Sequence, residues 1–245
     1  MPVLDDLEEA QRCELLKWAV VEHHRTWSLF DGDARRVVEH DGLDPLAVRK
    51  IAREYGVNRG ILKTKDENGK PIAGKDNSAK WLAEKISHAA GNWPESLQER
   101  AEACAEIARN ASREGYTRGE LASATTKIIW FCRPDGWTLF DRLAANGLGV
   151  PTRQSTKRML RFYTELSTRN FLISANCINE ILNDADFGEL YGERVIDKFL
   201  MLVGADNDWT VQAKDYARTP DGKTIIKTAN TISQAVGRNL LERQP

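Results

Sequence analysis

Hydrophobic positions recur along most of the chain at the three- to four-residue spacing of helices, so the pattern predicts a mostly α-helical protein. Strand signals are few, and the alternation of strands and helices that builds a parallel sheet is missing. The apolar run at 127–132 fits a buried strand or a buried helix, and residues 121–124 before it favour a helix. The remaining helices are expected at residues 5–28, 45–55, 78–90, 94–113, 137–146, 151–167, 170–182, 189–203 and from about 229 onward.

Polar positions mark the breaks between these helices. Asp31-Gly32-Asp33 is expected to end the first helix, and Pro220-Asp221-Gly222 predicts a turn before the last one. Residues 63–77 hold almost no apolar side chain, so an exposed loop or a small hairpin turning at Asn68-Gly69 is expected there. We expect one helical domain over residues 1–245, with possible subdomains at 1–115 and 116–245.

Composition and charge narrow the class of protein. Hydrophobic residues make up 41% and charged residues 29%, which is ordinary for a globular protein. The net charge of -1 excludes a strongly basic nucleic-acid coat, so a polyanion would have to bind at a local patch. The acidic N-terminus is unlike a signal peptide, and no apolar run approaches the roughly 18 residues of a membrane span. We expect a cytoplasmic protein that does not bind membranes and is a monomer.

The cysteines give no sign of a metal centre. Cys13, Cys104, Cys132 and Cys177 lie far apart without a CxxC pair, and few histidines lie near them. Zinc sites need closely spaced Cys and His ligands. We therefore expect reduced thiols, no metal and no cofactor.

The densest candidate chemistry lies in residues 125–149. Lys127 opens an almost wholly apolar run, and burying an amine without a partner is unfavourable by several kcal/mol. Asp141 stands at the start of an expected helix, where a carboxylate could both cap the helix and be directed into a pocket. A turn at Pro134 could bring the two side chains together. The alternative is a lysine whose amine reaches solvent and an ordinary N-cap aspartate.

This segment resembles the 8-oxoguanine-glycosylase-like branch of the helix-hairpin-helix DNA glycosylases, over roughly residues 121–148. The features that carry the resemblance are, in order, Thr126-Lys127, an apolar stretch ending in Phe131, Pro134-Asp135, an aromatic residue, and an apolar pair before Asp141. The chain departs from the superfamily in two ways. Residues 120–124 lack the usual Gly-x-Gly before the lysine, and the spacing from lysine to aspartate is shorter than in the best-known members.

The resemblance implies a helical fold with a cleft between subdomains and an enzyme that flips a modified base out of double-stranded DNA. Asp141 matches the essential aspartate, which would stabilise an oxocarbenium-like sugar while the N-glycosidic bond breaks. Lys127 matches the hairpin lysine; its attack on the sugar would add strand cleavage, whereas attack by water would leave an abasic site. Some relatives are thought to be phage-defence enzymes that remove hypermodified cytosines. Hypermodified cytosine and oxidised guanine are therefore both expected substrates.

Aromatic and basic residues near the motif are candidates for contacts with DNA. The aromatic ones would line a base pocket or belong to the core: Trp130, Phe131, Trp137 and Phe140. The basic ones would hold the DNA backbone or form a solvated helix face: Arg142, Arg153, Lys157, Arg158 and Arg161. The lysine-rich loop at 63–77 could reach across a groove or recognise a bulky base, and an ordinary surface loop is the alternative.

The competing function is a non-catalytic helical DNA-binding protein on the same scaffold. The near-neutral charge and the missing hairpin glycines favour it.

Overall fold

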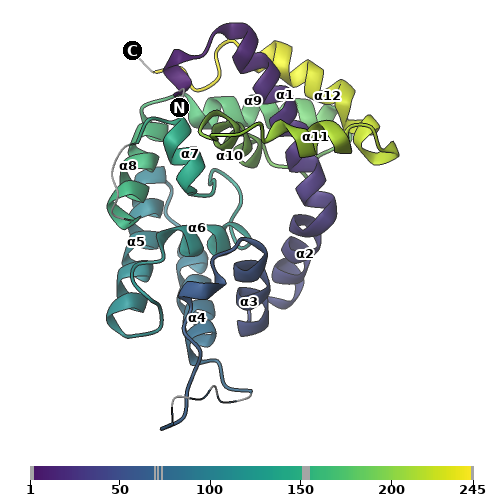
Figure 1. Cartoon of the computed structure of the whole chain (residues 1–245). Coiled ribbons are helices and arrows are strands. Elements are labelled where there is room, and N and C mark those ends of the chain that lie inside the picture. The colour runs from purple at the N-terminus through teal and green to yellow at the C-terminus, as the bar shows by residue number, and fades with distance from the viewer. Residues whose placement is uncertain (1–2, 69, 71, 73, 151–154, 244–245) are drawn as a thin grey trace. The chain divides into compact units, whose positions relative to one another are not determined.

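The computed structural model describes residues 3–68, 70, 72, 74–150 and 155–243, and it confirms a mostly helical chain (Figure 1). Among these residues there is no extended strand, and the isolated antiparallel bridges join Ile61 to Thr117 and Arg169 to Arg243. The helices are α1 Glu9–Thr26, α2 Gly32–Asp41, α3 Pro45–Glu54, α4 Asn77–Gly91, α5 Leu97–Arg113, α6 Ala122–Trp130, α7 Arg142–Gly147, α8 Ser155–Ser167, α9 Phe171–Asp184, α10 Gly192–Val203, α11 Thr210–Tyr216 and α12 Pro220–Val236.

The chain divides into two compact units. Unit 1 takes its described residues from Met1–Asp33, Asp135–Thr152 and Arg161–Pro245, and unit 2 takes its own from Ala34–Pro134 and Arg153–Leu160. This division differs from the expected boundary at residue 115. The reason is that α1, at the start of the chain, packs against α10, α11 and α12 near its end.

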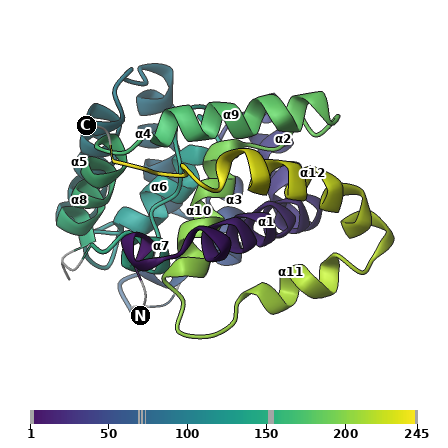
Figure 2. The ribbon, with the colours of Figure 1, turned by 90° about the horizontal axis from the view of Figure 1, so that it is seen from above.

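Unit 1 is built around α1 and α10. Figure 2 shows α9, α12 and α1 side by side, and α10 packs against α1, α7 and α9. Leu16 and Val20 of α1, Phe199 of α10 and Ile232 of α12 are fully buried at these contacts. Burying each such side chain contributes about 1.5–3 kcal/mol, so this helix packing is the main source of stability in the unit.

The helices α7 and α10 pack closely because a glycine lies at the C-terminal end of each, Gly147 as the last residue of α7 and Gly204 directly after α10. A Cβ added at Gly147 of α7 would overlap the carbonyl oxygen of Leu200, and one added at Gly204 would overlap that of Leu143. Both neighbours are backbone atoms, which cannot rotate aside as a side chain can. The close approach of the two helices therefore requires glycine at both positions.

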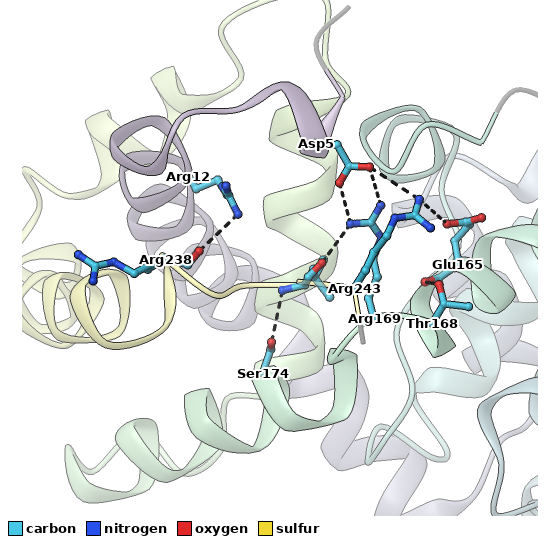
Figure 3. A network of polar contacts seen from close by, with 9 residues as sticks. Asp5, Arg12, Glu165, Thr168, Arg169, Ser174, Arg238 and Arg243 are labelled. Atoms are coloured by element: carbon cyan, nitrogen blue, oxygen red, sulfur yellow. Dashed lines mark hydrogen bonds and ion pairs between the residues drawn. The ribbon is translucent and has the colours of Figure 1, made fainter. Parts of the chain in front are cut away.

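A polar network joins the two ends of the chain in unit 1 (Figure 3). The buried guanidinium of Arg169 donates to both carboxylate oxygens of Asp5 at 2.9 Å and to the Leu241 carbonyl at 3.0 Å. Arg243 lies 3.7 Å from Asp5 and 3.4 Å from Glu165. Arg169 therefore stabilises the fold by joining the N-terminal and C-terminal segments.

Unit 2 is formed around α3, α4, α5 and α6. Residues 124–131 are all buried, and α6 covers them as far as Trp130, so the ambiguous apolar run is a helix, as its preceding residues indicated. Ile51 of α3, Ile86 of α4 and Ile128 of α6 lie in the core of this unit.

The breaks expected at Asp31-Gly32-Asp33 and at Pro220-Asp221-Gly222 were both wrong. Asp31-Gly32-Asp33 does not end the first helix, because a π-helical turn at Trp27–Asp31 continues α1 into α2. Gly32 permits this turn, since a Cβ there would lie 2.9 Å from the Trp27 indole nitrogen. Pro220 begins α12 instead of forming a separate turn, because the Thr219 hydroxyl caps the helix by accepting from Gly222 N at 3.1 Å.

Candidate functional site

Asp141 caps α7, as the sequence predicts. Its backbone is extended, with φ -132° and ψ 156°, and its Oδ1 accepts a hydrogen bond from Leu143 N at 2.9 Å. The side chain is half-buried, and Arg142 after it is exposed. The carboxylate is therefore held in a fixed orientation at the end of a buried segment.

Residues 137–146 were expected to be helical, but 137–141 belong to no helix and follow a turn at residues 135–136. Three hydrogen bonds from distant helices fix this segment. The Glu193 carboxylate of α10 accepts from Gly136 N at 2.7 Å, and the Glu193 carbonyl accepts from the Thr138 hydroxyl at 2.8 Å. The Tyr163 hydroxyl of α8 donates to the Thr138 carbonyl at 2.7 Å. The backbone that leads to Asp141 is thus positioned by two helices.

Glu193 is a positioning residue in this arrangement. It is 3% exposed, and burial raises the pKa of its carboxyl, while hydrogen bonds from its own backbone, from Gly136 and from Asn179 act in the opposite direction. Asn179 donates to Glu193 at 3.3 Å and also accepts from Gly192 N at 2.6 Å. These bonds compensate much of the cost of burying a carboxyl group.

The four candidate pocket aromatics are core residues in this structure. Trp130, Phe131 and Trp137 are completely buried, and Phe140 is 4% exposed. The Trp137 ring stacks on Tyr163 with centroids 4.2 Å apart, and Phe140 meets Phe162 edge-on at 5.6 Å. Rings packed in this way present no open face to a flipped base. The structure therefore favours the core alternative, and the role of these rings as pocket walls is not supported.

Lys127 lies in the last turn of α6, in unit 2, whereas Asp141 belongs to unit 1. The lysine is 6% exposed, and its Nζ lies 5.6 Å from the centroid of the Tyr55 ring. This is a cation–π contact, which stabilises a buried ammonium group. The expected approach of Lys127 to Asp141 stays a prediction.

The basic residues expected to contact the DNA backbone differ in how exposed they are. Arg142, Lys157 and Arg161 are exposed, and Arg158 is half-buried. Lys157 and Arg161 stand four residues apart on α8, so they share one face of that helix. Arg153 lies outside the described residues. An exposed pair on one helix face suits phosphate contact, and it equally suits a solvated face.

Sequence reasoning missed a buried ionic cluster in unit 1, which we call the α1–α10 cluster. Its members are Glu22, Arg25, Asp31, Arg194, Asp197 and Lys198. Arg194 pairs with Asp197 and lies 3.8 Å from Asp31; all three are at most 2% exposed. Lys198 Nζ lies 3.8 Å from Glu22, which is itself bound to Arg25 at 2.8 and 2.9 Å.

Burial lowers the pKa of Lys198 to about 7; Arg194 acts in the same direction and Glu22 opposes it. Burial also holds the pKa of His23, beside the cluster, well below its ordinary value. His23 Nε2 accepts from Tyr191 N at 3.2 Å, which fits a neutral imidazole. The sequence signal was present in α10, where charged residues at 193, 194, 197 and 198 interrupt an otherwise apolar helix.

The Lys198→Met variant is expected to lose a pH dependence of stability. The unfolded lysine, with its ordinary pKa near 10.5, binds a proton more tightly than the folded one, so stability rises with pH between about 7 and 10.5. The wild-type protein should gain about 1.5 kcal/mol in unfolding free energy from pH 7 to pH 8.5, and the variant should lose this gain. Urea denaturation across that range measures it. The exposed Lys227→Met is the control, and parallel pH curves for Lys198→Met and the wild type would contradict the assignment.

Potential metal ligands do not gather into clusters in the described part of the chain. Within the described ranges no group of three His, Cys, Asp or Glu side chains could hold a metal ion. The four cysteines are free thiols, and burial raises the pKa of Cys132 to about 11. None of the described helices has the length and apolar character needed to cross a bilayer.

Comparison with family models, curated proteins and solved structures finds no match to the chain.

Proposed function

We propose that the protein is a DNA glycosylase that excises a modified base, with Asp141 as its essential carboxylate. The proposal rests mainly on the position of Asp141. Its carboxylate is half-buried, and the segment before it is held in place by hydrogen bonds to Glu193 and Tyr163. A rigid carboxylate of this kind stabilises positive charge that develops on a sugar, because it needs no reorganisation during the reaction. The resemblance of residues 121–148 to DNA glycosylases supports this role.

In the proposed reaction the bond between C1′ of the flipped nucleotide and the base nitrogen breaks. Its electron pair leaves with the base, and C1′ becomes oxocarbenium-like beside Asp141. Water adds its oxygen to C1′, a proton from it passes to the departing base, and an abasic site remains. We assign the attack to water, because the Lys127 amine is buried over Tyr55. Borohydride should then trap little protein on the DNA.

The phosphates of duplex DNA would be held by exposed basic side chains. Arg142 follows Asp141 directly, and Lys157 and Arg161 share a face of α8. Such contacts orient a protein on DNA without reading its sequence. The substrate is a modified base, either a hypermodified cytosine of phage DNA or an oxidised guanine.

A second candidate is a non-catalytic DNA-binding protein. The burial of Trp130, Phe131, Trp137 and Phe140 favours it, since these rings leave no open aromatic face for a flipped base. The two functions share DNA binding and differ in base release.

Base release therefore tests the proposal. The protein is incubated with unmodified DNA, with 8-oxoguanine-containing DNA, and with phage DNA carrying glucosylated hydroxymethylcytosine. Abasic sites are counted with an aldehyde-reactive probe. Sites in one modified DNA but not in unmodified DNA are expected. Binding without any abasic sites would favour the non-catalytic protein.

A further inference from the structure

Lys198 lies at the edge of the α1–α10 cluster, where one face of α10 passes from the interior to the surface. Arg194, one turn earlier on that face, is 2% exposed, whereas the Lys198 side chain is 10% exposed. Met201 and Leu202, three and four residues later, are half-buried. The Lys198 amine forms no hydrogen bond with a described residue, and Glu22 lies 3.8 Å from it. The amine is therefore inside the protein and still in contact with solvent.

The groups around Lys198 favour its free amine. Arg194 places a second cation on the same face of α10, and it lies 3.8 Å from Asp31. Burial, Arg194 and Arg25 lower the pKa of Lys198, while Glu22 and Asp31 act in the opposite direction. A lysine that is desolvated or lies next to another cation is the kind that acts as a nucleophile in proteins, because more of it is neutral at ordinary pH.

Glu22 of α1 is placed to carry protons for this amine. Its Oε1 lies 3.8 Å from Lys198 Nζ and accepts a hydrogen bond from Arg25 at 2.9 Å, while its Oε2 accepts a second one at 2.8 Å. Arg25 also donates to Gln212 of α11 at 2.7 Å, so the carboxylate is held by a side chain that is itself fixed. An oriented carboxylate beside a nucleophile is the usual arrangement for general acid–base catalysis, and such contacts tighten when substrate binds.

The surroundings of Lys198 are separate from those of Asp141. Glu193 of α10 binds Gly136, in the segment that leads to Asp141, whereas Lys198 faces Glu22 of α1. The two sets of contacts are made by different faces of α10. An inference about Lys198 therefore does not rest on the proposed function.

We propose that Lys198 is the nucleophile of a second reactive site, where its amine forms an imine with a small aldehyde or ketone. The nitrogen lone pair forms the C–N bond, and the π electrons of the carbonyl group move to its oxygen. This oxygen then takes up both amine protons, carried by Glu22, and leaves as water, so that a neutral C=N bond remains. The Lys198 side chain is only 10% exposed, which admits a small molecule and excludes an abasic sugar within a DNA strand.

Acetaldehyde with saturating sodium cyanoborohydride tests the proposal on the intact protein. The reductant converts each imine into an ethylated amine, and peptide mass spectrometry gives the rate at each lysine. At pH 7 the free-amine fraction of Lys198 is about 10³-fold larger than that of an ordinary lysine. Lys198 should therefore react at least about tenfold faster than the exposed Lys227, and the ratio of the two rates should fall about a hundredfold by pH 10. A ratio near one at pH 7, or one that does not change with pH, would overturn the proposal.

Glu22→Gln distinguishes a proton carrier from a simple neighbouring charge. Losing the negative charge leaves more of the Lys198 amine free, so a purely electrostatic role predicts faster modification. A proton carrier predicts the opposite, a rate at Lys198 lower by about 10²-fold with no change at Lys227. Glu14→Gln, at an exposed position of α1, is the matched control and should react like the wild type. Modification of Lys198 that is unchanged or faster in Glu22→Gln would overturn the role given to Glu22.

Discussion

Asp141→Asn is expected to lower the rate of base release about 10²–10³-fold while DNA affinity stays within about twofold. Asparagine has the same shape as aspartate and caps a helix equally well, so the bond to Leu143 N is retained. What is lost is the negative charge beside the sugar, which matters only when positive charge develops there. The rate is measured in single turnover, with protein in excess over DNA, so that binding does not limit it.

Asp44→Asn is the matched control for this substitution. Asp44 caps α3 through a hydrogen bond from Ala47 N at 2.7 Å, so it has the same structural role as Asp141 without the proposed chemical one. Its variant should release base at the wild-type rate. If both variants were equally active, or equally impaired, the carboxylate of Asp141 would have no special part in the reaction.

Gly147→Ala is expected to destabilise the protein by about 3 kcal/mol, because the added methyl group meets backbone. The new Cβ would overlap the Leu200 carbonyl, and α7 would have to move away from α10. Since Asp141 caps α7, base release should fall as well. Urea denaturation and the single-turnover assay measure the two effects.

Gly91→Ala provides the comparison. Gly91 ends α4, and a Cβ there would meet nothing within 4 Å. Alanine is favoured over glycine in helices by about 1 kcal/mol, so this variant should be neutral or slightly stabilised. A Gly147→Ala protein as stable as Gly91→Ala would show that α7 and α10 do not need their close contact.

Much of the helical fold is predictable because it depends on local sequence. Helix α4 appears within one residue of its expected start and end, since apolar spacing and an N-cap at Asp76 both lie in the sequence. The helix boundaries that were predicted wrongly depend on sequence signals that fit two structures, or on hydrogen bonds to residues far away in the chain. Pro220-Asp221-Gly222 is typical of a turn and equally of a helix N-terminus once Thr219 caps it. Residues 137–141 lie outside any helix, and Thr138 is bonded to Glu193 and Tyr163, which lie far away in the chain.

The candidate site was predictable only in part. The N-cap role of Asp141 was predicted from its position and is confirmed. Aromatic residues occur both in base pockets and in hydrophobic cores, so the sequence alone could not distinguish these two roles for the four candidates. Their burial in the structure favours the core role. The sequence shows charged residues in an apolar helix, but it does not show which residues of other segments pair with them. Lys198 and Arg194 were therefore missed, because their partners on α1 and at Asp31 are known only from the structure.

The most direct test of the proposed function is to identify the base that leaves the DNA. Wild-type protein is incubated with duplex carrying the modified base, and the solution is analysed for free base by mass spectrometry while abasic sites are counted in the same sample. We predict one modified base released for each abasic site formed, and about 10²–10³-fold slower formation of both products with Asp141→Asn. Saturated binding with no free base and no abasic sites would contradict the assignment as a glycosylase.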